Sequence, residues 1–186
     1  MTRYLYFTRH GQSEWNVSDQ ICGSTDIPLT DKGREQAEIL AQQIKEEGIH
    51  IDEILCSPLK RAKETAEIIG RVNNIPVKVE PRLVEQNFGR WEGTSPRSSI
   101  GFQKAKLCFI DSYGNGETMF KAAHRVYSLL DEICADSFGK TYLLAAHNGI
   151  SRFMESYFRD MTNEEFAAFG IGNCQLVRYE LKDSCK

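Results

Sequence analysis

The chain has 186 residues, of which 41% are hydrophobic and 26% charged, and its formal net charge is −3. This length fits a single domain covering residues 1–186 with a substantial core, and the acidic balance argues against a general nucleic-acid binder. No apolar segment approaches the roughly 20 residues that span a bilayer, and the N-terminal residues predict a strand rather than a signal peptide. We therefore expect a cytoplasmic protein with no membrane partner and no nucleic-acid partner.

The first half of the chain alternates short apolar runs with amphipathic segments. The predicted elements are a strand at Arg3–Thr8, a helix at Asp31–Glu47, a strand at Ile54–Cys56, a helix at Pro58–Gly70 and a strand at Val77–Glu80. The first helix has one apolar face, formed by Ala37, Leu40, Ala41 and Ile44. Gly48 is placed to end this helix.

The second half continues the alternation after an irregular, glycine-rich stretch. The predicted elements are a helix at Glu117–Cys134, a strand at Tyr142–Ala146, a helix at Ile150–Phe158, a short helix from about Thr162 and a strand at Gln175–Leu181. This order predicts an α/β fold, a three-layer α/β/α sandwich with a mainly parallel sheet.

A histidine follows two of the apolar strands, and a glycine-containing turn follows each histidine. His10 comes after the first strand and His147 after Tyr142–Ala146. One such histidine is more often a structural residue, but two in matched positions are expected to converge at the carboxyl edge of the sheet, where α/β proteins bind ligands. Arg9 adds a planar donor fork suited to phosphate. This pairing predicts a histidine that attacks phosphorus.

Arg61 is expected in the first turn of a helix that has Ser57 as its N-cap and Pro58 at its first position. The free backbone N–H groups and the helix dipole at such a position favour a bound anion. An isolated helix arginine is more often a solvated surface residue, so Arg61 becomes a candidate only in combination with the two histidines.

Glu85 lies in the irregular stretch 82–93, beside Phe88 and Trp91. A loop glutamate is usually solvated, but aromatic neighbours would desolvate it and raise its pKa toward the working pH. This environment suits a general acid, a role typically worth about 10²–10⁴-fold in rate.

These segments together resemble the histidine phosphatase superfamily in its phosphoglycerate-mutase-like branch. The similar stretches occur in family order and are Arg9–Asn16, Cys22–Gly33, Cys56–Thr65, Leu83–Gly93, Asn115–Thr118 and Ala146–Gly149. They extend over most of the chain, from Thr8 to about Arg152, and in combination they are very specific.

The resemblance implies a role for each matching residue. His10 would be the nucleophile that forms a phosphohistidine, and Glu85 would protonate the leaving oxygen and later accept a proton from water. The phosphoryl oxygens would be held by Arg9, Arg61 and His147, and further substrate contacts would come from Gly11, Asn16, Cys22, Gly23 and Asn148. No metal and no other cofactor is expected, because the sequence has neither a carboxylate-rich metal motif nor a Walker-type loop.

The segment Thr94–Gly114 departs from the family pattern. Relatives usually have a longer helical insertion here, and the mutases have a paired arginine in it for the substrate carboxylate. The nearby cations of this chain are Arg97, Lys104 and Lys106, and we interpret them as surface charge. The short segment therefore argues against mutase activity and predicts a more open pocket.

Three functions fit these residues. The first is a phosphatase acting on phosphate monoesters of small metabolites. The second is a phosphoglycerate mutase, which shares the catalytic groups but excludes water from the phosphohistidine. The third is a non-catalytic module that binds a phosphorylated ligand, and it is weakened because no catalytic position is replaced. Assembly as a homodimer stays open.

The six cysteines include no C-x-x-C pair. In the absence of a signal peptide this pattern predicts reduced cytosolic thiols, several of them filling the core. The cysteines are Cys22, Cys56, Cys108, Cys134, Cys174 and Cys185.

Overall fold

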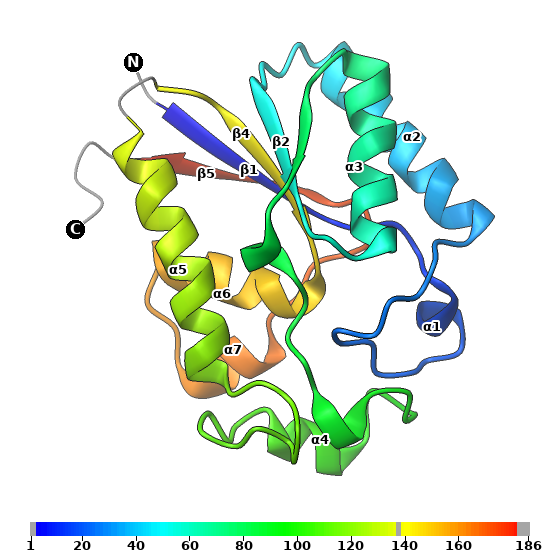
Figure 1. The fold of residues 1–186 in the computed structure, drawn as a ribbon, viewed down its shortest axis with the longest axis vertical. Helices are drawn as coiled ribbons and strands as arrows, with labels where there is room; N and C mark the ends of the chain where they lie inside the picture. The colour runs from blue at the N-terminus through cyan, green and yellow to red at the C-terminus, as the bar shows by residue number, and fades with distance from the viewer. Residues whose placement is uncertain (1–2, 137–138, 182–186) are drawn as a thin grey trace.

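Five strands form one sheet in the order β3-β2-β4-β1-β5 (Figure 1). The structure is a computed structural model and describes residues 3–136 and 139–181. The strands are β1 (Arg3–Arg9), β2 (Glu53–Cys56), β3 (Val77–Val79), β4 (Tyr142–Ala146) and β5 (Leu176–Leu181). β1, β2, β3 and β4 are parallel to one another, whereas β5 runs antiparallel to β1. The predicted, mainly parallel sheet is confirmed.

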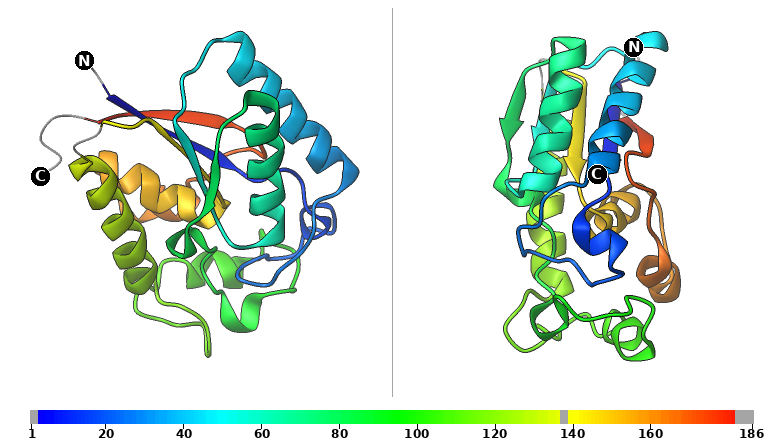
Figure 2. Two further views of the ribbon diagram at one scale, coloured as in Figure 1. Left: turned by 45° about the horizontal axis from the view of Figure 1, so that its top comes forward. Right: turned by 90° about the vertical axis from the view of Figure 1, so that its right-hand side faces the viewer.

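Helices cover both faces of this sheet. They are α1 (Glu14–Val17), α2 (Asp31–Glu46), α3 (Lys60–Asn73), α4 (Ile100–Ala105), α5 (Met119–Ala135), α6 (Asn148–Phe158) and α7 (Asn163–Ala168). Short 3-10 turns lie at Pro81–Leu83 and Gly89–Trp91. α2 and α3 pack on one face and α5 and α6 on the other, so the three-layer arrangement is also confirmed (Figures 1 and 2).

Strand β4 contributes side chains to the cores on both sides of the sheet, because successive side chains of a strand point to opposite faces. Leu143 and Ala145 belong to the core under α2 and α3. Leu144 and Ala146 belong to the core under α5 and α6. All four are buried, which explains why this strand is a continuous apolar run rather than an alternating one.

The helix after β2 begins later than predicted. Leu59 is extended and precedes the first residue of α3, Lys60, and it makes no side-chain cap. The Ser57 hydroxyl accepts a hydrogen bond from the Leu59 N–H at 3.3 Å. This local turn competes with helix formation, so Ser57 is not the N-cap and Pro58 is not in the helix. Arg61 still lies in the first turn.

The helix after β4 begins earlier than predicted. His147 is extended and serves as the N-cap residue, so α6 starts at Asn148 rather than at Ile150. Asn148 and Gly149 therefore lie in the first helical turn, where backbone N–H groups have no partner within the helix. This junction presents the Gly149 N–H to the carboxyl edge of the sheet.

The pairing of β1 with β4 brings the two strand-end histidines to one edge of the sheet. Arg9 is opposite Ala146 in the register, and the His10 N–H donates to the Ala146 carbonyl at 2.9 Å. His10 and His147 thus follow neighbouring parallel strands.

None of the helices within the described ranges is long and apolar enough to cross a membrane.

Candidate active site

The ring of His10 is held in one orientation by its neighbour. Its Nδ1 lies 2.6 Å from the carbonyl oxygen of Gly11. Because a carbonyl oxygen only accepts, Nδ1 carries the proton and Nε2 carries the lone pair. Burial, followed by the charges of Arg61 and Arg9, holds the pKa of His10 well below its ordinary value. A neutral imidazole with an unprotonated Nε2 is the form required of a nucleophile.

The guanidinium of Arg61 is buried beside that lone pair. Its Nε donates to His10 Nε2 at 3.3 Å, and its two terminal nitrogens donate to the carbonyls of Thr25 and Gly23, both at 2.8 Å. Two backbone carbonyls therefore fix the plane of the fork. A Cβ at Gly23 would lie 2.3 Å from Glu92 Oε1, so this loop position requires glycine.

His147 lies behind the same site and is completely buried. Its ring centroid is 5.2 Å from that of His10, and its Nε2 lies 2.7 Å from the Ser57 hydroxyl. Among the described residues its Nδ1 has no hydrogen-bond partner. Burial, and then Arg61 and His10, hold its pKa well below the ordinary value. The neutral form is therefore favoured, and it can offer one N–H donor.

The carboxylate of Glu85 is buried at the start of α6. Oε1 accepts from the Gln86 N–H at 2.9 Å and Oε2 from the Gly149 N–H at 2.8 Å. Burial raises the pKa of Glu85, although these backbone donors and the charges of Arg152 and Arg61 oppose the rise. The direction is the one predicted from the sequence.

The aromatic neighbours of Glu85 are only partly those expected. Phe88 lines the same cavity as Glu85. Trp91 does not line it and packs instead against Phe102, with ring centroids 5.8 Å apart.

Another carboxylate in this loop, Glu92, binds backbone N–H groups of the protein. It accepts from the backbone N–H groups of Ser24 at 2.9 Å, Thr25 at 2.9 Å and Phe88 at 3.0 Å. These bonds tie the loop that holds Arg61 to the loop that carries Glu85. Glu92 does not line the cavity, whereas Glu85 does.

Arg9 and His10 are anchored by residues far along the chain. Arg9 donates from one terminal nitrogen to the Ile171 carbonyl at 2.9 Å, and Asn173 donates from its side chain to the His10 carbonyl at 2.8 Å. Within the described residues the Nε of Arg9 is buried without a partner. Burial, and then Arg97, lower the pKa of Arg9 to about 10. Its guanidinium keeps unused donors at the cavity.

The predicted substrate-binding residues differ in their hydrogen bonds within the protein. Asn16 accepts from the Ser13 N–H at 3.1 Å, and Asn148 accepts from the Ile171 N–H at 2.9 Å. Burial raises the pKa of the Cys22 thiol to about 11, so it remains protonated. The Gly11 N–H donates to the Thr65 hydroxyl at 3.1 Å. Both backbone polar groups of Gly11 are thus engaged within the protein.

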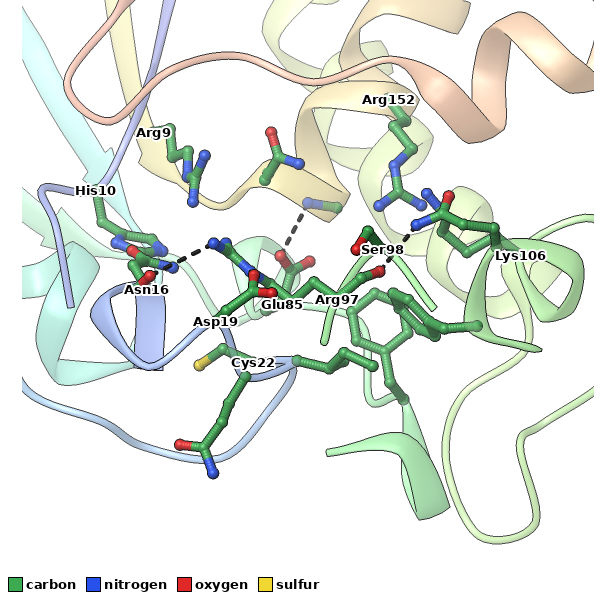
Figure 3. Close-up of a pocket in the computed structure, with 17 residues that line it drawn as sticks. Arg9, His10, Asn16, Asp19, Cys22, Glu85, Arg97, Ser98, Lys106 and Arg152 are labelled. Carbon is green, nitrogen blue, oxygen red and sulfur yellow. Dashed lines mark hydrogen bonds and ion pairs between the residues drawn. The ribbon is translucent and has the colours of Figure 1, made fainter. Parts of the chain in front are cut away.

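A cavity of about 340 Å³ opens in front of these groups (Figure 3). The predicted residues that line it are Arg9, His10, Asn16, Cys22, Glu85 and Asn148. Gly11, Gly23, Arg61 and His147 do not line it. Arg61 and His147 nevertheless contact the His10 ring, so they form the wall behind it.

The far side of the cavity contains cations that the sequence did not assign to the site. Lys106 is only 7% exposed and lines the cavity, so its interpretation as surface charge is wrong. Arg97 also lines the cavity, where it pairs with Asp19 at 2.8 Å. Lys104 is exposed, as expected. Lys106 caps the short helix α4, and a helix of six residues gives no periodic signal for its burial.

Arg152 also belongs to the cavity, and the sequence analysis did not assign it to the site. It is 5% exposed and lines the cavity. It follows Gly149 by three positions, which in a helix is the same face. Within residues 3–136 and 139–181, no three His, Cys, Asp or Glu side chains gather in a group that could hold a metal ion.

Comparison with known proteins identifies the family of this chain. The family model of the histidine phosphatase superfamily (branch 1) matches residues 5–186. The chain is 30% identical to the probable phosphoglycerate mutase GpmB of Yersinia enterocolitica, over 97% of this chain and 86% of that protein. It is 29% identical to phosphoserine phosphatase 1 of Hydrogenobacter thermophilus, over 91% of this chain and 82% of that protein.

Among solved structures, a mutant phosphoserine phosphatase from Entamoeba histolytica in complex with phosphoserine has the same fold. Its TM-score is 0.79 at 29% identity, over 94% of this chain and 89% of that one. The match to the family model covers nearly the whole chain and agrees with the resemblance of the sequence motifs. The chain belongs to branch 1 of the histidine phosphatase superfamily.

Proposed function

We propose that this protein is a phosphatase that hydrolyses phosphate monoesters of small metabolites through a phosphohistidine at His10. The observation that carries the proposal is the neutral His10 ring, whose Nδ1 proton is fixed on the Gly11 carbonyl and whose Nε2 faces Arg61. Relatives named as phosphatases support hydrolysis as the reaction.

In the first step His10 Nε2 attacks the phosphorus and the bond from phosphorus to the ester oxygen breaks. Glu85, whose pKa is raised by burial, acts as the general acid and gives a proton to the departing oxygen. Arg9 and Arg61 oppose the charge of the phosphoryl oxygens, and His147 adds one hydrogen-bond donor. The leaving alcohol departs neutral.

In the second step water attacks the phosphorus of the phosphohistidine and the bond from phosphorus to Nε2 breaks. Glu85, now a carboxylate, takes a proton from the attacking water, and inorganic phosphate leaves. Capture of the phosphoryl group by nitrogen divides one difficult displacement into two easier ones. The second step regenerates the neutral His10 and the protonated Glu85.

A phosphoglycerate mutase is the alternative that the relatives support, since the GpmB protein is named as a probable mutase. It would use the same groups and return the phosphoryl group to a second hydroxyl instead of to water. The short segment between Thr94 and Gly114 favours the phosphatase, because it lacks a pair of arginines for the carboxylate of phosphoglycerate.

The decisive experiment measures phosphate release from p-nitrophenyl phosphate beside the interconversion of 3- and 2-phosphoglycerate. We expect phosphate release without interconversion, and an acid-labile, base-stable phosphate on the wild-type protein. His10→Ala should lose turnover and the trapped phosphate, while His50→Ala, an exposed histidine, should retain both. Interconversion as the main activity would establish the mutase, and normal turnover by His10→Ala would exclude the covalent mechanism.

We also propose that the enzyme acts in the cytoplasm, without nucleic-acid or membrane partners. The free thiols of Cys22, Cys56, Cys108 and Cys174 support a reducing compartment, whereas Cys185 lies outside the described residues. Sedimentation of the purified protein distinguishes a monomer from a homodimer.

A further inference from the structure

Arg152 is a buried cation, and part of its guanidinium has no hydrogen-bond partner among the described residues. It lies on α6 at 5% exposure, and its Nε and one terminal nitrogen have no hydrogen-bond partner among the described residues. Buried donors of this kind are rare in folded proteins, because they lose water without replacement. Arg152 also lines the cavity in front of His10. A ligand that enters this cavity could supply the missing partners.

Lys106 is a second cation of the same cavity wall, and no carboxylate in the described part of the chain forms an ion pair with it. Its Nζ donates to the Ala167 carbonyl at 2.7 Å. An ammonium group has three donors, so two remain for other partners. Burial, and then the charge of Arg152, lower the pKa of Lys106 to about 8. The positive charges of Arg152 and Lys106 therefore repel each other at this wall of the cavity.

These two cations lie apart from the phosphate end of the cavity. In Figure 3 Arg9 and His10 lie at one end, Arg152 and Lys106 at the other, and Glu85 between them. A phosphoryl group on His10 would engage Arg9 and Arg61, which contact that end. Arg97 is already paired with Asp19.

We propose that Arg152 and Lys106 form a second oxyanion subsite, so that the preferred substrate carries an anionic group in addition to the phosphate that is cleaved. This inference rests on the proposed phosphatase function and specifies its substrate class. A carboxylate and a second phosphate share the required chemistry, since both accept the planar fork of an arginine.

The test compares matched esters that differ only in the second anion. O-phosphoserine against O-phosphoethanolamine tests a carboxylate, and propane-1,3-diol bisphosphate against its monophosphate tests a second phosphate. We expect the wild-type kcat/KM to favour the anionic member of at least one pair by about tenfold or more. Arg152→Met and Lys106→Met should reduce this ratio strongly, and Arg152→Lys should reduce it partly. Lys104→Met, an exposed lysine of α4, should leave the ratio unchanged.

Binding without turnover makes the result independent of catalysis. Calorimetric titration of the same esters into the His10→Ala protein should show the same preference, and His10→Ala combined with Lys106→Met should lose it. If Arg152→Met does not fold, the Lys106 variants and the wild-type ratio decide.

The two proposals fail in different ways. The subsite would be overturned by equal kcat/KM values for both members of both pairs. It would also be overturned by a preference that survives in Arg152→Met and Lys106→Met. In either case hydrolysis of p-nitrophenyl phosphate would still report the phosphatase activity. An enzyme that hydrolyses no ester, yet binds the anionic esters preferentially through Arg152 and Lys106, would overturn the proposed function and support the subsite.

Discussion

The Gly149 N–H donates to Glu85 at 2.8 Å, and a Cβ at position 149 would lie 2.3 Å from Oε1 of the same carboxylate. The first turn of α6 therefore holds the carboxylate, and any side chain at position 149 would have to displace it. The position of Glu85 depends on a glycine 64 residues away in the sequence.

Gly149→Ala should displace the Glu85 carboxylate. Overpacking of this kind typically costs about 1–3 kcal/mol of unfolding free energy. We expect kcat to fall more than KM rises, because Glu85 is proposed to act in the chemical steps. Gly172→Ala is the matched control, since its Cβ would meet nothing nearer than 3.5 Å. Denaturant unfolding and steady-state kinetics test both, and equal behaviour of the two variants would contradict this account of Gly149.

Arg61→Lys keeps the positive charge but removes the fork that bonds Gly23, Thr25 and His10. The rate and the affinity for inorganic phosphate should both fall, by about tenfold or more. Lys60→Ala, at the neighbouring and exposed position, should change little. Phosphate inhibition constants and kcat/KM provide the measurement, and equally mild effects would place Arg61 outside the working site.

Glu85→Gln should slow esters according to their leaving group. A sugar phosphate needs a proton on its departing oxygen and should lose about 10²–10⁴-fold, whereas p-nitrophenyl phosphate should lose less in the first step. Because the second step also needs Glu85, the phosphohistidine should persist and a burst of nitrophenol should appear. A small and uniform loss on both esters would instead mean that another group supplies the proton.

The two buried histidines predict a particular dependence of stability on pH. The pKa values of His10 and His147 lie below the ordinary value of 6.5 in the folded protein, so the unfolded chain binds protons more tightly. Their contribution is present above about pH 6.5 and is lost as the pH falls from there toward the folded-state pKa. Glu85 has a raised pKa in the folded protein, so above its ordinary pKa of 4.5 it lowers the stability of the folded state.

The measurement is the unfolding free energy of wild type and His10→Ala across this range. Below about pH 6.5 the wild type should lose stability more steeply than His10→Ala. His50→Ala should run parallel to the wild type, because that histidine is exposed. Parallel curves for His10→Ala and wild type would show that His10 is not held neutral by the fold.

The parts of the fold that depend on local patterns were predictable from the sequence. The apolar face of α2 is buried as expected, and Gly48 ends the helix at a φ of 63°. The start of α3 was predicted wrongly because it depends on a turn at Ser57, whose hydroxyl also contacts His147. The start of α6 was predicted two residues late, because a strand-to-helix junction without a loop has no signal in composition.

The candidate site was predictable where a motif fixes a residue to a strand end or a helix start, as for His10, His147 and Arg61. Lys106 was misjudged because its burial depends on the packing of α4 over the cavity, which periodicity in a six-residue helix does not reveal. The catalytic and binding roles and the single-domain organisation stay predictions.

The contacts of Arg9 and His10 with Ile171 and Asn173 connect residues separated by 162 and 163 positions. A nascent chain carries His10 long before it carries the residues that anchor it. The pocket is consequently completed only when this late segment has left the ribosome and packed beside β1. Long-range closure of this kind also makes the site one of the slowest parts of the molecule to assemble.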